Sequence, residues 1–198
     1  YLAAGTLRDR LEAAGPLPWR EAVTLIVALA GGVHALHAAG ILHRDIKPSN
    51  VGFTADGVPK LLDFGLARAE TEGVDWAAGQ DNADVGAAAT ATRTGALVGT
   101  LPYLAPEVVA GHRPEPAVDV WALSVLLFES LSGVSPFLER TPALTALRLR
   151  KAEPPDAGLL PTDVPESVRT FLEDALTPDG RARPRTAGQF LQGVGRLV

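Results

Sequence analysis

A polar run in the first third of the chain is the feature that most constrains its fold and its chemistry. The run reads His43-Arg44-Asp45-Ile46-Lys47-Pro48-Ser49-Asn50, and Asp63-Phe64-Gly65 begins thirteen residues after its last residue. The two segments supply two carboxylates, one ammonium group and one amide, and carboxylate and amide oxygens are the ligands that Mg²⁺ prefers. A fold that uses these groups has to bring two loops of the chain to one cleft.

The residues around the polar run predict a long helix followed by a small hairpin. Apolar residues recur at helical spacing over 18–39, beginning just after Pro18, and we expect Gly40 to cap the end of this helix. Residues 51–53 and 59–62 have the character of short strands on either side of a turn at Asp56 and Gly57. The polar run is therefore predicted to connect a helix to a hairpin.

Helices dominate the remaining pattern. A short helix is predicted at 6–13, and 118–131 is apolar almost all round, which is typical of a helix buried on every side. Further helices are expected at 142–150, 165–176 and 186–197. One mainly helical domain with a small inserted hairpin follows from this pattern.

Composition excludes several classes of protein. The chain has 198 residues, 46% of them apolar, which is enough for the core of one domain, and it has no cysteine for a disulfide framework or a cysteine zinc site. Its net charge of −5 arises within 69–92, which holds five acidic residues and no Lys or Arg. No basic patch suits nucleic acid, so we expect no nucleic-acid partner. Low-complexity residues 69–95 predict a loop.

The apolar runs at 22–42 and 118–131 contain charged residues or histidines, so we expect no membrane segment in this chain and a cytoplasmic location. A parent protein could still be anchored to a membrane. The first residue is not methionine, and we expect the chain to be a piece of a longer polypeptide.

With Ala105-Pro106-Glu107 further along the chain, the polar run and the Asp63 motif resemble the catalytic half of a eukaryotic-type serine/threonine protein kinase. The excess of Arg over Lys suggests a bacterial member. The resemblance implies an α+β protein-kinase-like fold in which residues 1–198 form the mainly α-helical large lobe with a small β-hairpin. It also implies an activation loop at about 66–104 and a small N-lobe that is missing from these residues.

The resemblance implies transfer of the γ-phosphate of ATP to Ser or Thr hydroxyls of protein substrates, with Mg²⁺ as the metal. Asp45 would orient and deprotonate the hydroxyl, and Lys47 would neutralise the transferred phosphate. Asn50 and Asp63 would hold Mg²⁺. The positions expected to bind the nucleotide and its metal are Lys47, Ser49, Asn50, Gly52 and Asp63.

Arg44 directly before Asp45 implies control by phosphorylation of the loop, because a guanidinium can hold a phosphate through two hydrogen bonds. The candidate acceptors are Thr90, Thr92 and Thr94. Autophosphorylation between the two copies of a homodimer is a possible route. The acidic residues of the loop would compete for Arg44 before phosphorylation.

Other residues take architectural roles in the resemblance. Residues 99–107 resemble the substrate-docking segment of the family, in which Thr100 would hydrogen-bond Asp45 and Lys47. Asp119 would accept hydrogen bonds from the backbone of the His43–Arg44 turn. The remaining expectations are a stack of His43 on Phe64 and an ion pair of Glu107 with Arg183, whose loss would cost about 3–5 kcal/mol if it is buried.

Three departures keep other interpretations open. The chain has no glycine-rich phosphate loop, and Lys60 and Lys151 are in the wrong contexts to replace the strand lysine that contacts the α- and β-phosphates. Gly52 stands where a Leu or Met commonly floors the adenine, and Ser124 replaces a common Gly. A pseudokinase that binds without catalysis and a small-molecule phosphotransferase of the same fold are the alternatives. Asp45 and Asn50 could also be mere turn formers beside Pro48. His34 and His37 are interpreted as surface and packing residues of the helix.

Overall fold

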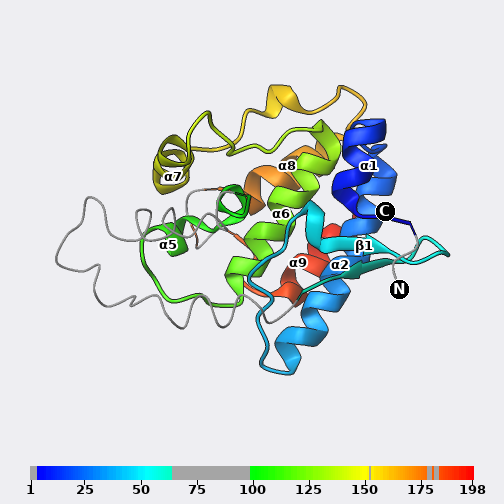
Figure 1. Cartoon of the computed structure of the whole chain (residues 1–198), viewed down its shortest axis with the longest axis horizontal. Helices are drawn as coiled ribbons and strands as arrows, with labels where there is room; N and C mark the ends of the chain where they lie inside the picture. Colours follow the sequence, from blue (N-terminus) through cyan, green and yellow to red (C-terminus); the bar gives the residue numbers. More distant parts are fainter. Residues whose placement is uncertain (1–3, 64–98, 152, 178–179, 181–182) are drawn as a thin grey trace.

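The computed structural model describes residues 4–63, 99–151, 153–177, 180 and 183–198. Phe64, Thr90, Thr92 and Thr94 lie outside these residues, so the roles predicted for them stay predictions. Within the described part, the fold is mostly helical with one two-stranded antiparallel sheet, which is the predicted class (Figure 1).

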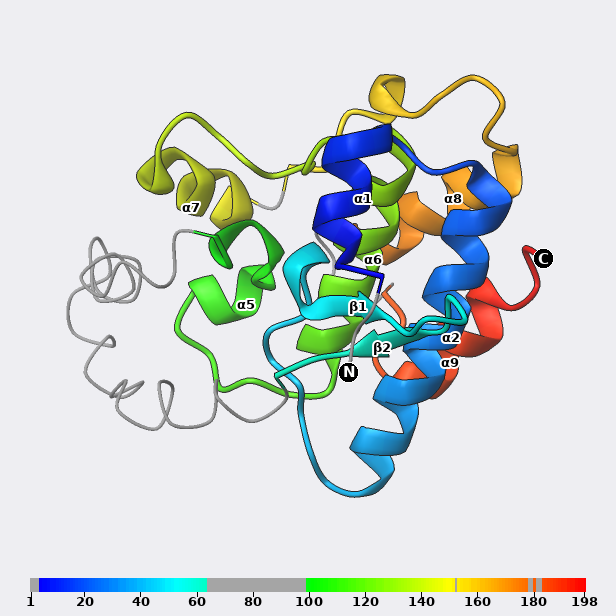
Figure 2. The ribbon, with the colours of Figure 1, turned by 45° about the vertical axis from the view of Figure 1, so that its right-hand side comes forward.

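The helix α6 (Ala117–Ser132) is the centre of the core. It packs against α2 (Trp19–Ala38), α8 (Glu166–Ala175) and α9 (Ala187–Val194), and it lies between these helices and the α5 and α7 side of the lobe in both ribbon views (Figure 2). Nearly all of its side chains are buried, including Leu123, Leu126 and Leu127. The predicted all-round burial of this helix is confirmed.

The helix α2 delivers the chain to the polar run. Its length and apolar composition alone would let it cross a membrane, but seven of its apolar side chains are buried in the core, and it packs against α6 and α9. Pro18 precedes its first turn, and the helix ends at Ala39 as C-cap. Gly40 follows with φ of 74°, so the expected glycine lies one residue beyond the cap, where a left-handed conformation reverses the chain.

The hairpin pairs β1 (Val51–Phe53) with β2 (Pro59–Leu61) in the register Val51 to Leu61. Its turn uses Gly57 at φ of 78°. The pairing continues one step beyond β2, because the Leu62 N–H donates to the Asn50 carbonyl oxygen at 2.8 Å. This bond ties the residue before Asp63 to the end of the polar run.

The start of the described chain covers the other edge of β1. The Phe53 N–H donates to the Gly5 carbonyl oxygen at 3.1 Å. Immediately afterwards α1 (Leu7–Ala14) begins with a capping box, in which Thr6 and Asp9 satisfy each other's backbone N–H groups. The Arg10 guanidinium lies over the Phe53 ring, 3.4 Å from its centroid.

Several short elements were not predicted from the sequence. They are η1 (Pro48–Asn50), η2 (Leu101–Tyr103), α5 (Pro106–Val109) and η3 (Ala157–Leu159). The element η2 lies within the activation loop expected at about 66–104, and its three residues are buried. The last helix is shorter than predicted, since α9 ends at Val194. The helix α7 (Pro142–Lys151) packs on α5 and η2.

A partly buried hydrogen bond fixes η2 on α6. The Tyr103 hydroxyl donates to the Glu129 carboxylate at 2.5 Å. Burial raises the pKa of Glu129, while this hydrogen bond and the charge of Arg8 act in the opposite direction. Burial likewise raises the pKa of the Tyr103 phenol. The carboxylate of Glu129 is thus held where ionisation is costly.

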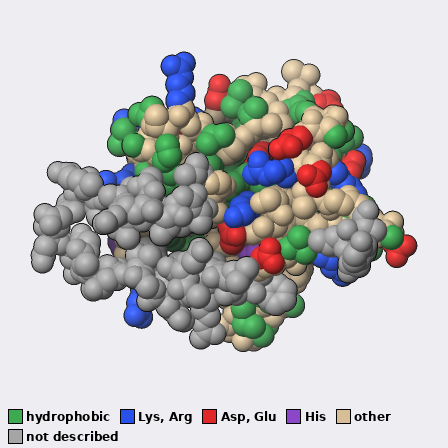
Figure 3. Space-filling view, viewed as in Figure 1, with side chains coloured by type: hydrophobic (Ala, Val, Ile, Leu, Met, Phe, Trp, Pro, Cys, Tyr) green, Lys and Arg blue, Asp and Glu red, His purple; other side chains and the backbone are tan. Residues whose placement is uncertain are grey.

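The surface has charges of both signs. On the face shown in Figure 3, the described Lys and Arg side chains lie among Asp and Glu side chains. Hydrophobic side chains gather over α7, where Leu144 and Leu147 are about half exposed. This face therefore shows no broad basic area among its described atoms.

We expect Leu123→Ala to lower the free energy of unfolding by about 2–5 kcal/mol, because it would leave a cavity at the centre of the core. Leu123 is 0% exposed, whereas Leu138 is 59% exposed. Urea unfolding of both variants provides the measurement, with Leu138→Ala as the control expected to change stability by less than about 1 kcal/mol. Equal losses in the two variants would contradict the core assignment.

Glu129→Gln is expected to gain stability relative to the wild type as the pH rises. The folded pKa of Glu129 lies above its unfolded value, so its contribution to stability is complete below the unfolded pKa and is lost as the pH rises through the folded pKa. The variant amide does not titrate. Melting temperatures at about pH 4 and about pH 8 test this expectation, with Glu12→Gln on the exposed face of α1 as control. A variant-minus-wild-type difference that is the same at both pH values would refute it.

Candidate active site

The carboxylate of Asp45 accepts hydrogen bonds from three neighbouring side chains. Its Oδ1 accepts from the Lys47 ammonium at 2.8 Å and from the Thr100 hydroxyl at 3.0 Å. The same ammonium donates to the Thr100 hydroxyl at 2.7 Å, so both contacts predicted for Thr100 are present. The side chains of Asp45 and Lys47 are 23% and 17% exposed, which leaves the carboxylate partly accessible to solvent.

Asn50 holds the other oxygen of this carboxylate. Its amide nitrogen donates to Asp45 Oδ2 at 2.6 Å and to the Asp45 carbonyl oxygen at 2.8 Å. Because the nitrogen is used in this way, the amide oxygen is the atom that can serve a cation. Asn50 lies in η1, and the backbone bond from Leu62 brings Asp63 next to it. An amide oxygen and an exposed carboxylate from adjacent backbone segments fit a hard divalent cation.

The described residues contain no group of three or more His, Asp or Glu side chains poised for a metal. A site built on Asn50 and Asp63 has only one such side chain. It would need oxygens from a bound phosphate and water to complete the coordination, as Mg²⁺ sites commonly do.

Two residues of the site have backbone conformations that are unusual for side chains other than glycine. Arg44 has φ of 66° and Asp63 has φ of 56°. Such left-handed residues persist where the surrounding structure holds them, and they occur often at functional sites. Each one lies directly before or within a motif predicted to act in catalysis.

The buried carboxylate of Asp119, at the start of α6, holds the turn that precedes Asp45. It is 1% exposed. Its Oδ2 accepts from the His43 N–H at 2.9 Å and its Oδ1 accepts from the Arg44 N–H at 2.7 Å, so the two predicted contacts are present. A third donor was missed: His37 Nε2 lies 2.8 Å from Asp119 Oδ2. His37 was interpreted as a packing residue, and helical periodicity carries no signal for a partner on another helix.

His43 is fully buried beneath the loop. Burial lowers the pKa of its imidazole, and the nearby carboxylates of Asp119 and Asp45 act in the opposite direction. The Asp45 N–H points to His43 Nδ1 at 3.4 Å. The predicted stack on Phe64 cannot be compared, because Phe64 lies outside the described residues.

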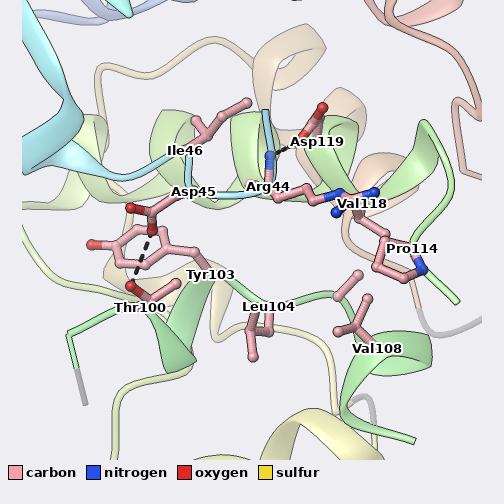
Figure 4. Close-up of a pocket in the computed structure, with 12 residues that line it drawn as sticks. Arg44, Asp45, Ile46, Thr100, Tyr103, Leu104, Val108, Pro114, Val118 and Asp119 are labelled. Atoms are coloured by element: carbon pink, nitrogen blue, oxygen red, sulfur yellow. Dashed lines mark hydrogen bonds between the residues drawn. The ribbon is translucent and has the colours of Figure 1, made fainter. Parts of the chain in front are cut away.

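A small apolar pocket of about 40 Å³ lies behind the loop, between it and the docking segment (Figure 4). The Asp45–Thr100 hydrogen bond stands at one end of it and the Arg44–Asp119 hydrogen bond at the other. The Arg44 side chain extends along the pocket toward Val118 and Pro114. The guanidinium therefore lies on the α6 side of the loop.

The predicted ion pair between Glu107 and Arg183 is present, with Arg183 Nη2 at 3.0 Å from Glu107 Oε2. The Arg183 guanidinium also lies over the Trp121 ring, 4.9 Å from its centroid. The pair is only partly buried, since the Glu107 side chain is 26% exposed. Solvent screening of such a pair lowers its value, so the loss of about 3–5 kcal/mol expected for a buried pair is too high here.

The remaining predicted positions line up along the same loop and hairpin. Ser49 lies in η1 and is half-buried, and Gly52 is buried in β1 opposite Lys60.

Ser124, which replaces a common glycine, lies in α6. Its hydroxyl donates to the Val120 carbonyl oxygen at 2.8 Å, so the buried hydroxyl has a hydrogen-bond partner within the helix. The Tyr103–Glu129 hydrogen bond was not predicted from the sequence, because it joins residues far apart in the chain.

The comparisons agree with this geometry. The family model described as "Protein kinase domain" matches residues 1–193. A relative named serine/threonine-protein kinase PknA, from Mycobacterium tuberculosis, is 36% identical over 96% of this chain and 40% of its own length. Drp72 from Corynebacterium efficiens, named a serine/threonine-protein kinase, is 36% identical over 100% of this chain and 34% of its own.

PknK from Mycobacterium tuberculosis, also named a serine/threonine-protein kinase, is 35% identical over 99% of this chain and 16% of its own length. The chain thus spans two fifths or less of these curated relatives. The range matched by the family model, residues 1–193, includes the polar run, the Asp63 motif and the docking segment. This chain belongs to the protein kinase domain family.

Proposed function

We propose that this chain is the large lobe of a cytoplasmic enzyme that phosphorylates Ser or Thr hydroxyls of protein substrates. The observation that supports this best is the set of contacts among Asp45, Lys47, Asn50 and Thr100. These residues hold one partly exposed carboxylate in a fixed orientation beside a cation. Turn formers without a shared task would not need three side-chain donors on one carboxylate.

Asp45 is the group that takes the hydrogen bond of the substrate hydroxyl. Asn50 and Thr100 fix its two oxygens, so the acceptor direction is set before a substrate arrives. The Lys47 ammonium, 2.8 Å from Asp45 Oδ1, offers positive charge where the transferred phosphate would carry negative charge. A lysine at this position resembles the kinases that act on Ser and Thr, and this resemblance supports Ser/Thr substrates.

Asn50 and Asp63 are the residues that would hold Mg²⁺, and Ser49 and Gly52 would face the nucleotide. MgATP would supply the phosphoryl group and neutralise charge on it as transfer proceeds. The chain contains no glycine-rich phosphate loop, and its lysines do not stand in the context of the strand lysine that contacts the α- and β-phosphates in the family. We therefore propose that an N-lobe outside these 198 residues supplies those contacts, and that this lobe alone has little activity.

The Arg44 guanidinium is proposed to bind the phosphate of phosphorylated Thr90, Thr92 or Thr94 in the activation loop. A second copy of the protein is one proposed source of this phosphate. Its guanidinium extends away from Asp45 toward Pro114. A phosphate bound there would act on the loop that carries Asp45 through the Arg44 backbone.

A binding module without catalysis is the second candidate, and Gly52 favours it. A buried glycine in β1 offers no side chain beneath an adenine ring. The lost apolar contact is worth about 1.5–3 kcal/mol for a full side chain. Activity of the complete protein distinguishes the two candidates.

We expect Asp45→Asn in the complete protein to lower kcat by a factor of about 10²–10⁴, because an amide cannot accept the proton of the hydroxyl. Radiolabel transfer from MgATP to a Ser/Thr peptide is the measurement. Asp56→Asn, in the exposed hairpin turn, is the matched control and should keep full activity. A wild-type protein that binds MgATP but transfers no phosphate would support the binding module instead.

Thr100→Val is expected to lower kcat/KM by roughly 10-fold or more, since it keeps the shape of the side chain but removes a hydrogen bond to each of two charged groups. Thr100→Ser keeps the hydroxyl and should retain most of the activity. Steady-state kinetics of both variants provides the comparison. If Ser and Val impaired the enzyme equally, the hydroxyl contacts would not be what positions Asp45.

A further inference from the structure

A second pocket, of about 520 Å³, lies where α5, the start of α6 and the end of α8 meet the segment 183–185. It shares no lining residue with the apolar pocket behind the loop that carries Asp45. Charged side chains line much of this second pocket, and the apolar side chains of Val120 and Ala175 complete its wall. The pocket is therefore separate from the residues that surround Asp45.

The lining of the pocket has an excess of positive charge. Its described residues include three arginines and two glutamates, so one positive charge remains uncompensated. In the sequence, Asp179 and Arg181 carry the only charges among residues 178, 179, 181 and 182, and these two cancel. The whole chain has a net charge of −5, so the sign of the pocket is opposite to that of the chain. A concave surface with one sign of charge attracts ligands of the other sign.

One of the three arginines, Arg183, is held by its neighbours. Its Nη2 lies 3.0 Å from Glu107 Oε2, and its guanidinium lies over the Trp121 ring. A Cβ at position 180 would stand 2.8 Å from the same Nη2, so Gly180 leaves the space that the guanidinium occupies. The charge of Arg183 is thus already used inside the protein.

Arg113 and Arg185 are the cations that remain for a ligand. Arg113 is exposed, and its side chain makes no ion pair or hydrogen bond with another described residue. Arg185 Nη2 lies 3.9 Å from Glu115 Oε2, and these two side chains are 65% and 70% exposed. A pair so long and so exposed contributes little to stability. Arg185 can therefore exchange Glu115 for the carboxylate of a ligand.

The wall of the pocket also contains a donor that has no acceptor. Trp121 is 1% exposed, and its indole N–H is buried without a hydrogen-bond partner among the described residues. An indole nitrogen can only donate, and a buried donor without an acceptor costs free energy. An oxygen atom supplied by a ligand would remove this cost. The charge and the donor both favour a ligand that carries anionic oxygens.

The size and the lining of the pocket distinguish among anionic ligands. Its volume of about 520 Å³ is far larger than an inorganic anion and lies in the range of about 300–1,000 Å³ that is usual for ligand pockets. Glu107 and Glu115 would oppose the second charge of a phosphate dianion. Separate carboxylates need only one cation each, and the apolar wall suits the carbon chain of a peptide.

We propose that this pocket, which we call the Arg113–Arg185 pocket, binds an acidic segment of a protein partner through Glu or Asp carboxylates. None of the residues around Asp45 lines it, so the partner would use no catalytic group. The site is thus a binding function beyond the proposed phosphoryl transfer and does not depend on it.

The test measures the binding of fluorescent peptides to the complete protein by anisotropy. One peptide alternates Glu with Leu, and the reference peptide has Gln in place of each Glu. Neither peptide contains Ser, Thr or Tyr, so the result is independent of transferase activity. We expect the Glu peptide to bind at least about tenfold more tightly than the Gln peptide, and added salt to weaken it.

Arg113→Glu is expected to weaken binding of the Glu peptide about tenfold, because it places a like charge opposite the carboxylates. Arg140→Glu, at an exposed position before α7, changes the net charge equally and should alter Kd less than about twofold. Glu115→Gln removes an opposing charge and should tighten binding about two- to fivefold. Glu12→Gln, on the exposed face of α1, should leave Kd unchanged. Should Arg113→Glu fail to fold, Arg185→Glu provides the same comparison.

Equal binding of the two peptides, or no binding of the Glu peptide, would overturn the proposal. Equal effects of Arg113→Glu and Arg140→Glu would also overturn it, since they would reflect net charge alone. If inorganic phosphate bound through Arg113 while the Glu peptide did not, the pocket would be a site for small anions and the proposal would be wrong. A wild-type protein that binds the Glu peptide through Arg113 but transfers no phosphate would refute the proposed function and support this inference.

Discussion

A single buried carboxylate connects the core of this lobe to its active site. Asp119 is the only acidic side chain among the fully buried residues that the structure describes, and it lies in a helix that is otherwise apolar almost all round. Burying an unpaired carboxylate costs several kcal/mol, so the fold is stable only when donors reach it. Those donors come from the end of α2 and from the backbone before Asp45. The conformation of the loop that carries Asp45 is therefore a condition of core stability.

The elements with a regular pattern could be predicted from the sequence. The buried helix expected at 118–131 is α6, at 117–132, and the hairpin strands agree to within one residue. Periodicity indicates which side chains face the core. The helix and the hairpin could be predicted because their core-facing side chains hold them in place. The contacts of Thr100, Asp119 and Glu107 were also anticipated, but through the family resemblance and not through periodicity. Their catalytic roles, like those of Asp63 and Ser49, stay predictions.

The parts that were missed depend on contacts between distant segments. The helix η2 has only three residues, and it is fixed by Tyr103 on Glu129 and by the packing of α7. His37 bonds a residue 82 positions away, and its place on a helical face gives no indication of that partner. The partial exposure of the Glu107–Arg183 pair likewise depends on how the surrounding segments cover it. No local pattern contains this information.

Strain and preorganisation meet in the same loop. Arg44 and Asp63 both hold left-handed conformations at positions where glycine would adopt them more easily. Neither residue is a glycine, so the surrounding contacts have to supply the stabilisation: Asp119 for the first turn, and the bond from Leu62 to Asn50 beside the second. Catalysis of phosphoryl transfer depends mainly on positioning and charge. A lobe whose core stabilises the strained backbone can hold Asp45, Lys47 and Asn50 in place before substrates bind, because the buried carboxylate of Asp119 fixes the turn directly before Asp45.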